Sequence, residues 1–301
     1  MKNNILLPDG ILVGHDTIKN KTGVTVILAP EGAVGGVSVQ GCAPGTRETD
    51  LLAPTKAVEK VHAVVFSGGS AFGLSAADGV MLYCKENNIG FEVAEVKVPL
   101  VSAAVIFDLH DTSYTFPDAK AGYRACKNAN NEDIKFGSIG AGTGATVGKM
   151  LGAACSQKGG IGAATVLAGN AFVTAISVVN ALGDIMDPSS GQIVAGLHDG
   201  EGNFINTANM ILNGAASLQA GTNTTLSCIL TNVNLTKLQA NKLAAIAHDA
   251  YAKTISPVHT DYDGDTIFCL SKGSETMDFT ALSVMAVKAV SDSILNAVKG
   301  K

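Results

Sequence analysis

The sequence predicts a layered α/β fold whose sheets are mixed or antiparallel rather than purely parallel. Hydrophobic residues make up 47% of the 301 residues and charged residues only 16%, which is typical of a globular chain with a large core. β-Branched runs separated by turn residues open the chain, which indicates antiparallel hairpins. Helical and strand patterns then alternate to the C-terminus, so helices are expected to cover the sheets.

The N-terminal half contains four predicted strands and two predicted helices. Residues 23–28 and 33–40 are β-branched runs, and Pro30, Glu31 and Gly32 between them indicate a hairpin turn. The further elements are a buried strand at 61–67, an amphipathic helix at 73–87, a strand at 100–109, and a surface helix with a loop at 118–135.

The C-terminal half begins with the most apolar stretch of the chain, residues 161–182. It contains polar residues such as Asn170 and Asn180 and lacks flanking basic and aromatic anchors, so we expect a buried helix or a strand–helix pair and not a membrane span. Residues 205–223 are polar with weak periodicity, which predicts an exposed linker. The remaining predicted elements are a strand from Thr224, a helix at 235–253, a strand at 265–270 and a helix at 278–298.

Composition excludes several classes of protein. The net charge is −5 and tryptophan is absent, so we expect no nucleic-acid partner. The N-terminus has only three consecutive apolar residues before Pro8, too few for a signal peptide. Six cysteines are scattered without a CxxC pair or a companion histidine, which predicts free thiols in the cytoplasm and no metal site.

A glycine-rich loop at 136–149 suggests a nucleotide site as an alternative function. Residues 140–145 satisfy the relaxed dinucleotide pattern GxGxxA, but no acidic residue follows about 20 residues later. The phosphate-loop pattern fails because Met150 follows Lys149, where Ser or Thr is required. A nucleotide-binding enzyme that uses residues 140–149 therefore stays as the alternative.

Two structural interpretations compete for the acidic segment Asp261–Asp265. It resembles the start of a calcium loop, but Thr266 stands at the obligatory glycine position and Lys272 at the position of the bidentate Glu. Asp263 followed by Gly264 is also typical of a hairpin turn.

The predicted polar linker ends at Asn223, and the predicted buried strand begins at Thr224. A Thr hydroxyl held against its own preceding carbonyl can attack that carbonyl, giving an ester that water then cleaves. The new N-terminal Thr has an α-amine with a pKa of about 7.7–8.0, which can deprotonate its own hydroxyl. This junction is therefore a candidate for self-cleavage.

Eight segments, taken in order, resemble the DmpA-like self-cleaving N-terminal-nucleophile hydrolases. This family includes the L-aminopeptidase/D-esterases, the β-peptidyl aminopeptidases and the endo-type 6-aminohexanoate-oligomer (nylon-oligomer) hydrolases. The Asn223–Thr224 junction and the Asp-x-Asp pair of Asp263 and Asp265 are most similar to the nylon-oligomer branch. The resemblance covers nearly the whole chain, in segments 41–49, 65–73, 103–109, 140–149, 158–162, 178–183, 223–226 and 257–265.

The resemblance implies a fold, a maturation step and an activity. The fold is a four-layer α/β/β/α sandwich of the DmpA type, with an architecture like that of the Ntn hydrolases, formed by a single domain over 1–301. The chain is expected to cleave itself into a large subunit, 1–223, and a small subunit, 224–301. The implied activity is hydrolysis of amide bonds in small peptides or ω-amino-acid oligomers, without a cofactor, by a homo-oligomer of cleaved units that is expected to be a tetramer.

The resemblance also implies the catalytic residues. Thr224 is the expected nucleophile and its α-amine the base. Asp263 and Asp265 are expected to orient and assist Thr224. Asn180 corresponds to the family's donor to the oxyanion, and Lys149 to its active-site lysine.

Three further residues are expected at the substrate pocket. Gly142 and Gly144 belong to the glycine loop, which would form a backbone wall near the substrate. Phe107 stands where the family has a tyrosine, so a phenolic donor is missing. This departure leaves a catalytically silent protein of the same fold as a second alternative.

Overall fold

The computed structural model describes residues 5–109, 114–214 and 222–299. Its centre is a nine-stranded sheet in the order β10-β11-β14-β16-β2-β4-β7-β3, with β1 added against β2. The pairs β14–β16 and β4–β7 are parallel and the other pairs are antiparallel, so the sheet is mixed. The strands are β1 (Leu12–Ile18), β2 (Thr22–Val39), β3 (Thr46–Arg47), β4 (Lys60–Ser67), β7 (Val101–Val105), β10 (Gly160–Ala168), β11 (Ala171–Asn180), β14 (Thr224–Val233) and β16 (Thr266–Glu275).

The long strand β2 connects the two halves of this sheet. Residues 22–28 pair with β1 and β4, whereas residues 34–39 pair with β16. The hairpin predicted at 30–32 is therefore wrong, because the chain keeps its direction and residues 29–32 bulge opposite His62 of β4. Pro30 has no N–H to donate to the ladder and Gly32 adopts a φ of +77°, so both residues suit a bulge as well as a turn.

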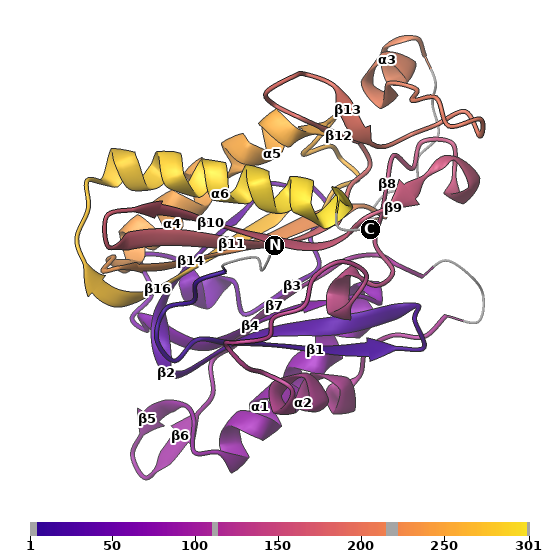
Figure 1. The fold of residues 1–301 in the computed structure, drawn as a ribbon. Helices are drawn as coiled ribbons and strands as arrows, with labels where there is room; N and C mark the ends of the chain where they lie inside the picture. Colours follow the sequence, from indigo (N-terminus) through magenta and orange to yellow (C-terminus); the bar gives the residue numbers. More distant parts are fainter. Residues whose placement is uncertain (1–4, 110–113, 215–221, 300–301) are drawn as a thin grey trace.

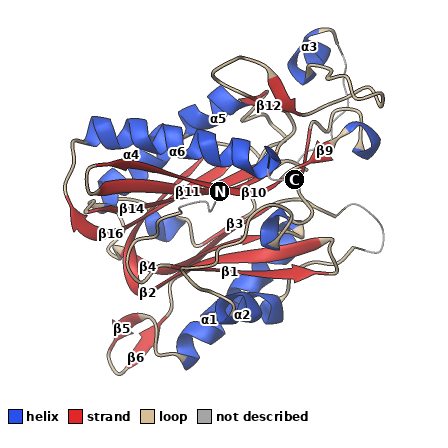
Figure 2. Cartoon of the chain, viewed as in Figure 1, coloured by secondary structure: helices blue, strands red, loops and turns tan. Residues whose placement is uncertain are grey.

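Helices cover both outer faces of the sheet, which gives four layers (Figure 1; Figure 2). The helices α1 (Ala76–Glu86) and α2 (Ala119–Lys127) pack on one half of the sheet, and α4 (Lys237–Ile246), α5 (His248–Thr254) and α6 (Phe279–Lys299) pack on the other. A third apolar cluster, which contains Phe66 of β4 and Phe268 of β16, fills the space between the two halves. The predicted α/β/β/α layering is confirmed.

The apolar stretch 161–182 forms the hairpin β10–β11, so the helix or strand–helix pair expected there is wrong. Gly169 and Asn170 make the turn, and Gly169 has a φ of +62°. All of β11 is buried, and a buried strand and a buried helix have the same apolar composition. Among the described residues, α6 alone is long and apolar enough to cross a membrane, but it packs on β10 and β11 as a core helix does.

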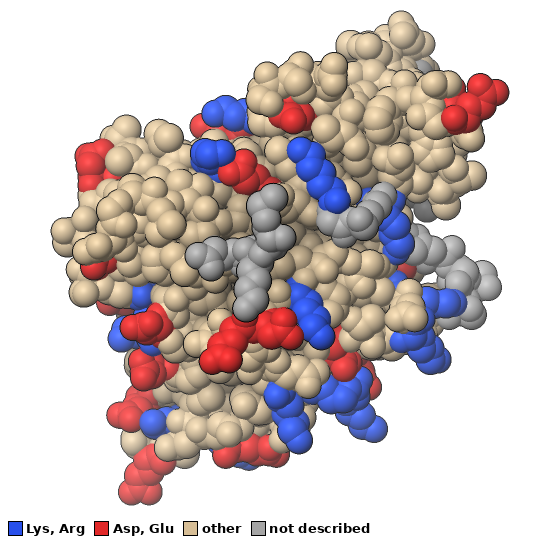
Figure 3. Space-filling model, in the orientation of Figure 1, with Lys and Arg blue, Asp and Glu red and all other residues tan. Residues whose placement is uncertain are grey.

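The other predicted strands and helices occur close to their expected positions, with two differences. The helix predicted at 235–253 is divided at Ala247 into α4 and α5. The linker predicted at 205–223 contains a short helix, α3 (Thr207–Leu212), and its residues 215–221 lie outside the described residues. On the face drawn in Figure 3, basic and acidic side chains both occur, and several of them lie next to each other.

Smaller elements complete the fold around the central sheet. They are β5 (Phe91–Val93), β6 (Val96–Val98), β8 (Thr146–Val147), β9 (Gln157–Lys158), β12 (Asp184–Met186), β13 (Ile193–Ala195), β15 (Ile255–Ser256) and the 3₁₀ turns Asp50–Leu52, Ser70–Ser75, Gly140–Gly142 and Ala153–Cys155.

Candidate active site

Three neighbouring strands bring the predicted catalytic residues to one edge of the sheet. Asn180, the last residue of β11, lies directly opposite Thr224, the first residue of β14. Because β14 and β16 run parallel, the residues that precede them also meet, and Asn223 pairs with Asp263. Residues that are far apart in the sequence therefore share one end of β11, β14 and β16.

The Asn223–Thr224 junction is buried, and its carbonyl group has two hydrogen-bond donors. Asn223 and Thr224 are 1% and 4% exposed. The Thr224 hydroxyl donates to the carbonyl oxygen of Asn223, and the backbone N–H of Gly264 donates to the same oxygen at 2.9 Å. Negative charge develops on this oxygen when a nucleophile attacks the carbonyl carbon, and a hydrogen-bond donor at the oxygen stabilises that charge.

Gly264 is a site residue that the sequence reasoning missed. A Cβ atom at this position would lie 2.8 Å from Oγ1 of Thr224 and 2.8 Å from the carbonyl oxygen of Ala43. Only glycine therefore lets the backbone come this close to the Thr224 hydroxyl. The Asp-Gly pair was the available signal, but the hairpin turn that it suggested is not formed, because Asp263 pairs with Asn223 instead.

The two aspartates hold different parts of the site. Asp265 is 1% exposed and accepts the backbone N–H of Thr225 at 2.7 Å, which fixes the start of β14. Asp263 accepts the N–H and the hydroxyl of Thr260, at 2.8 and 2.6 Å. Burial, with a smaller contribution from the charge of Asp265, raises the pKa of Asp263 to about 6.

Lys149 contacts both Asn180 and the segment that leads into the junction. Its Nζ donates to the backbone carbonyl and the side-chain oxygen of Asn180, at 2.9 and 2.7 Å, and to the carbonyl of Thr222 at 3.1 Å. Burial of this ammonium group lowers the pKa of Lys149 to about 7, against the opposing influence of the Asp263 and Asp108 carboxylates. The amide nitrogen of Asn180 donates to the carbonyl of Phe107 at 3.0 Å, and the side-chain oxygen of Asn180 also accepts the N–H of Thr146 at 3.1 Å. Two segments of the chain therefore hold the Asn180 side chain.

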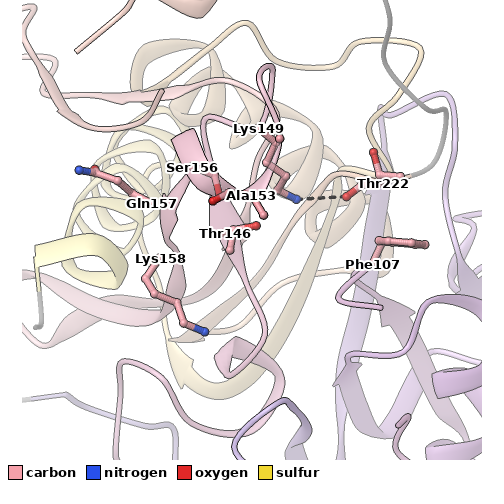
Figure 4. Close-up of a pocket in the computed structure, with 9 residues that line it drawn as sticks. Phe107, Thr146, Lys149, Ala153, Ser156, Gln157, Lys158 and Thr222 are labelled. Atoms are coloured by element: carbon pink, nitrogen blue, oxygen red, sulfur yellow. Dashed lines mark hydrogen bonds between the residues drawn. The ribbon is translucent and has the colours of Figure 1, made fainter. Parts of the chain in front are cut away.

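A cavity of about 400 Å³ opens beside the junction (Figure 4). Phe107 and Thr222 lie next to each other on one side of it, and Lys149 points towards Thr222. The cavity is large enough for a short peptide or oligomer segment. Its described lining residues are Phe107, Thr146, Lys149, Gly152, Ala153, Ser156, Gln157, Lys158 and Thr222, none of which is acidic.

Gly142 and Gly144 of the glycine loop pack closely against other segments of the protein. A Cβ atom on Gly142 would meet the backbone of Gly160 and Ile161, and one on Gly144 would meet the carboxylate of Asp108. Neither Gly142 nor Gly144 is among the described residues that line this cavity, and their place at the substrate pocket stays a prediction.

The same packing argues against the nucleotide alternative. Within the loop, the N–H groups of residues 140 and 141 donate to Thr17 and Thr25, and those of 142, 143 and 145 donate to carbonyls of the loop itself. A phosphate cradle needs such N–H groups to point at the ligand, and here they bind the protein.

The sequence profile of peptidase family S58 matches residues 3–300. The chain belongs to peptidase family S58. It is 40% identical over 263 residues to an uncharacterised aminopeptidase of Mycobacterium tuberculosis, which covers 84% of this chain and 74% of that relative. It is 33% identical over 301 residues to the 6-aminohexanoate-oligomer endohydrolase of Kocuria sp., covering 92% and 81% of the two chains.

Two solved structures share the fold of this S58 chain. A β-aminopeptidase of Burkholderia sp. has a TM-score of 0.71 and 19% identity, with 99% of this chain and 87% of that chain covered. The L-aminopeptidase D-Ala-esterase/amidase of Ochrobactrum anthropi, a variant of the Ntn-hydrolase fold, has a TM-score of 0.72 and 16% identity over 96% and 84%. The predicted family is confirmed, and the chain is a hydrolase of peptide or amide bonds.

Replacing Gly264 by Ala should slow the self-cleavage expected at the junction by about a hundredfold. The added methyl group would displace the Thr224 hydroxyl or the N–H donor at 264, and a displacement of about 1 Å can reduce a rate by about a hundredfold. Gel electrophoresis of the purified variant over time measures the cleavage. Leu167→Ala, at an exposed position of β10, is the control. If Gly264→Ala is cleaved as fast as Leu167→Ala, the role assigned to Gly264 is wrong.

Proposed function

We propose that this chain cleaves itself between Asn223 and Thr224 and then hydrolyses amide bonds with Thr224 as the nucleophile. The single observation that carries the proposal is the contact of the Thr224 hydroxyl with the carbonyl group of its preceding residue, which Gly264 also binds. Membership of family S58 supports a peptide- or amide-bond hydrolase, and the junction supplies its nucleophile.

Self-cleavage would proceed in two steps. Oγ1 of Thr224 attacks the carbonyl carbon of Asn223 and its proton passes to a base, while the Gly264 N–H stabilises the oxyanion. The C–N bond to Thr224 breaks, its nitrogen takes up a proton, and an ester joins Asn223 to the Thr224 oxygen. Water then hydrolyses this ester, which leaves the carboxylate of Asn223 and the free α-amine of Thr224.

Two groups near the junction can accept the hydroxyl proton before the α-amine is free. Asp263, with its pKa raised to about 6, is ionised at neutral pH, and Lys149, with its pKa lowered to about 7, is partly neutral there. After cleavage the α-amine of Thr224 is the base for substrate hydrolysis. Asp263 and Asp265 would then hold this amine, and Asn180 and the Gly264 N–H would bind the substrate oxyanion.

The proposed substrates are small peptides or ω-amino-acid oligomers. Relatives of the chain are named as aminopeptidases and as 6-aminohexanoate-oligomer endohydrolases, and the cavity beside Thr222 is the space next to the reacting bond. Lys149 and Lys158 line this cavity and its described lining has no carboxylate, which supports substrate groups without a free ammonium at this position.

We also propose that the cleaved units associate, as a tetramer in the cytoplasm. The hairpin β5–β6 supports association, because Phe91, Val93, Val96 and Val98 alternate along its strands and are all at least 40% exposed. Six free cysteines, four of them buried, are consistent with a reducing compartment.

Purified wild-type protein should consist of two fragments of roughly 23 and 8 kDa, because the proposed reaction separates residues 1–223 from 224–301. Thr224→Ala should stay as one inactive chain, since it has no hydroxyl, whereas Thr224→Ser should still be cut. Intact mass spectrometry and N-terminal sequencing measure the outcome. Another start residue would disprove this junction, and a persistent uncut wild-type chain without activity would favour the catalytically silent alternative.

Self-cleavage should accelerate as the pH rises from about 5 to about 8. Asp263 loses its proton through about pH 6 and Lys149 through about pH 7, so both bases are protonated at pH 5 and available at pH 8. The measurement is the fraction of cut chain over time after newly translated, uncut chain is diluted into buffers of different pH. In Lys149→Gln, the cleavage rate should increase only near pH 6, where Asp263 loses its proton. A wild-type cleavage rate that does not depend on pH would contradict the assignment of these two bases.

Phe107→Tyr should raise kcat on small amides by about tenfold without a matching fall in KM, because a phenolic donor at the cavity would strengthen binding of the oxyanion. Wild type and variant are assayed on the same panel of aminoacyl p-nitroanilides and longer ω-amino-acid amides. Phe72→Tyr, at an exposed aromatic outside the described lining of the cavity, is the control. An unchanged or lower kcat throughout the panel would show that Phe107 is a packing residue.

A further inference from the structure

His259 holds the side of Asp265 that faces away from the junction. One oxygen of Asp265, Oδ1, accepts the N–H of Thr225 at 2.7 Å. The other, Oδ2, accepts the backbone N–H of His259 at 3.2 Å and lies 2.8 Å from its ring atom Nδ1. The tautomer of His259 with its hydrogen on Nδ1 donates to this oxygen, because a carboxylate oxygen accepts hydrogen bonds.

The backbone of His259 adopts an unusual conformation to make these contacts. Its φ is +55°, in the left-handed region that residues with a side chain rarely adopt. In this conformation the backbone N–H and the imidazole both reach the same oxygen of Asp265. Strained residues of this kind cluster at functional sites, where the surrounding structure holds them.

The imidazole of His259 is fixed by two other rings. The ring of His248 lies 4.8 Å away and that of Tyr251 lies 5.8 Å away, both measured between ring centroids. Tyr251 is fully buried and donates to the hydroxyl of Ser227 on β14 at 2.8 Å, and His248 lies 3.2 Å from the carbonyl of Ser38 on β2. The cluster therefore ties His259 to the two strands that flank Asp265.

We propose that His259 is a positioning residue for Thr224, and that it acts through Asp265. The His259 ring orients the Asp265 carboxylate. This carboxylate in turn fixes the N–H of Thr225, and therefore the peptide plane that follows Thr224. His259 is not among the described residues that line the cavity, so the role we assign to it is the positioning of Asp265 and not a contact with substrate. This inference rests on the proposed function of Thr224.

Isosteric variants separate the N–H group of His259 from the rest of its side chain. His259→Asn places an amide N–H where Nδ1 stands, and asparagine tolerates the left-handed conformation. His259→Asp has the same size and tolerance but replaces the donor by an acceptor, and His259→Gly removes the side chain without backbone strain. Asn88→Gly, at an exposed residue with a φ of +56° after α1, controls for a glycine in this conformation.

We expect His259→Asn to cleave itself and to turn over substrate within about threefold of wild type. His259→Gly and His259→Asp should lose about tenfold to a hundredfold in self-cleavage rate and in kcat, with little change in KM, because the nucleophile is displaced while the cavity is intact. The melting temperature of each variant is measured alongside, and Asn88→Gly should behave as wild type.

Two results would overturn the proposal. One is wild-type rates in both His259→Asp and His259→Gly, and the other is an Asn variant as slow as the Asp variant, which would mean that the ring and not its N–H matters. If the Gly variant does not fold, the Asn and Asp pair decides. A wild-type chain that is never cut would instead refute the proposed function, so the two failures are distinguishable.

Discussion

The parallel pairing of β14 with β16 is the constraint on which the candidate active site depends. It places Asn223 against Asp263 and brings the N–H of Gly264 to the carbonyl oxygen of Asn223. A shift of one residue in this register would turn the Thr224 side chain to the other face of the sheet. It would also move the carbonyl oxygen of Asn223 away from the N–H of Gly264. The chemistry proposed for Thr224 is therefore a consequence of strand register more than of any single side chain.

The layers around the sheet make this register rigid. β14 lies between β11 and β16 near the middle of one half of the sheet, and its residues contribute to the core on both faces. Thr224 and Asn223 are buried at the end of this strand, where water is largely excluded and a hydrogen bond to a developing charge is stronger than in solvent. A cut at this point would leave both fragments in one hydrogen-bonded sheet, because β14 pairs on each side with a strand.

Burial also gives the site two groups that titrate near neutral pH. The same desolvation acts in opposite directions on a carboxyl group and on an ammonium group: it raises the pKa of Asp263 and lowers that of Lys149. Both groups approach the range in which a proton acceptor is effective, and both lie beside residues of the junction. Their values follow from the tertiary environment, since each residue has an ordinary pKa in an unfolded chain.

The sequence alone determined the alternation of strands and helices, the start of β14 at Thr224 and, through the ordered resemblance, the family. Thr224, Asp263, Asp265, Asn180 and Lys149 were all expected in one site, and the structure places them around one end of β11, β14 and β16. These features are local, because a β-branched run or a motif is written in consecutive residues.

Only the tertiary structure decided the features that depend on contacts between distant segments. It converted the expected turn at 30–32 into a bulge within β2, and the apolar stretch 161–182 into a hairpin, since burial on both faces removes the periodicity that distinguishes a strand from a helix. It brought Gly264 and His259 to the site. The physical reason is that no sequence pattern marks a backbone N–H such as that of Gly264, or a side chain such as His259 that binds the second oxygen of a carboxylate. The fold alone determines what these groups bind.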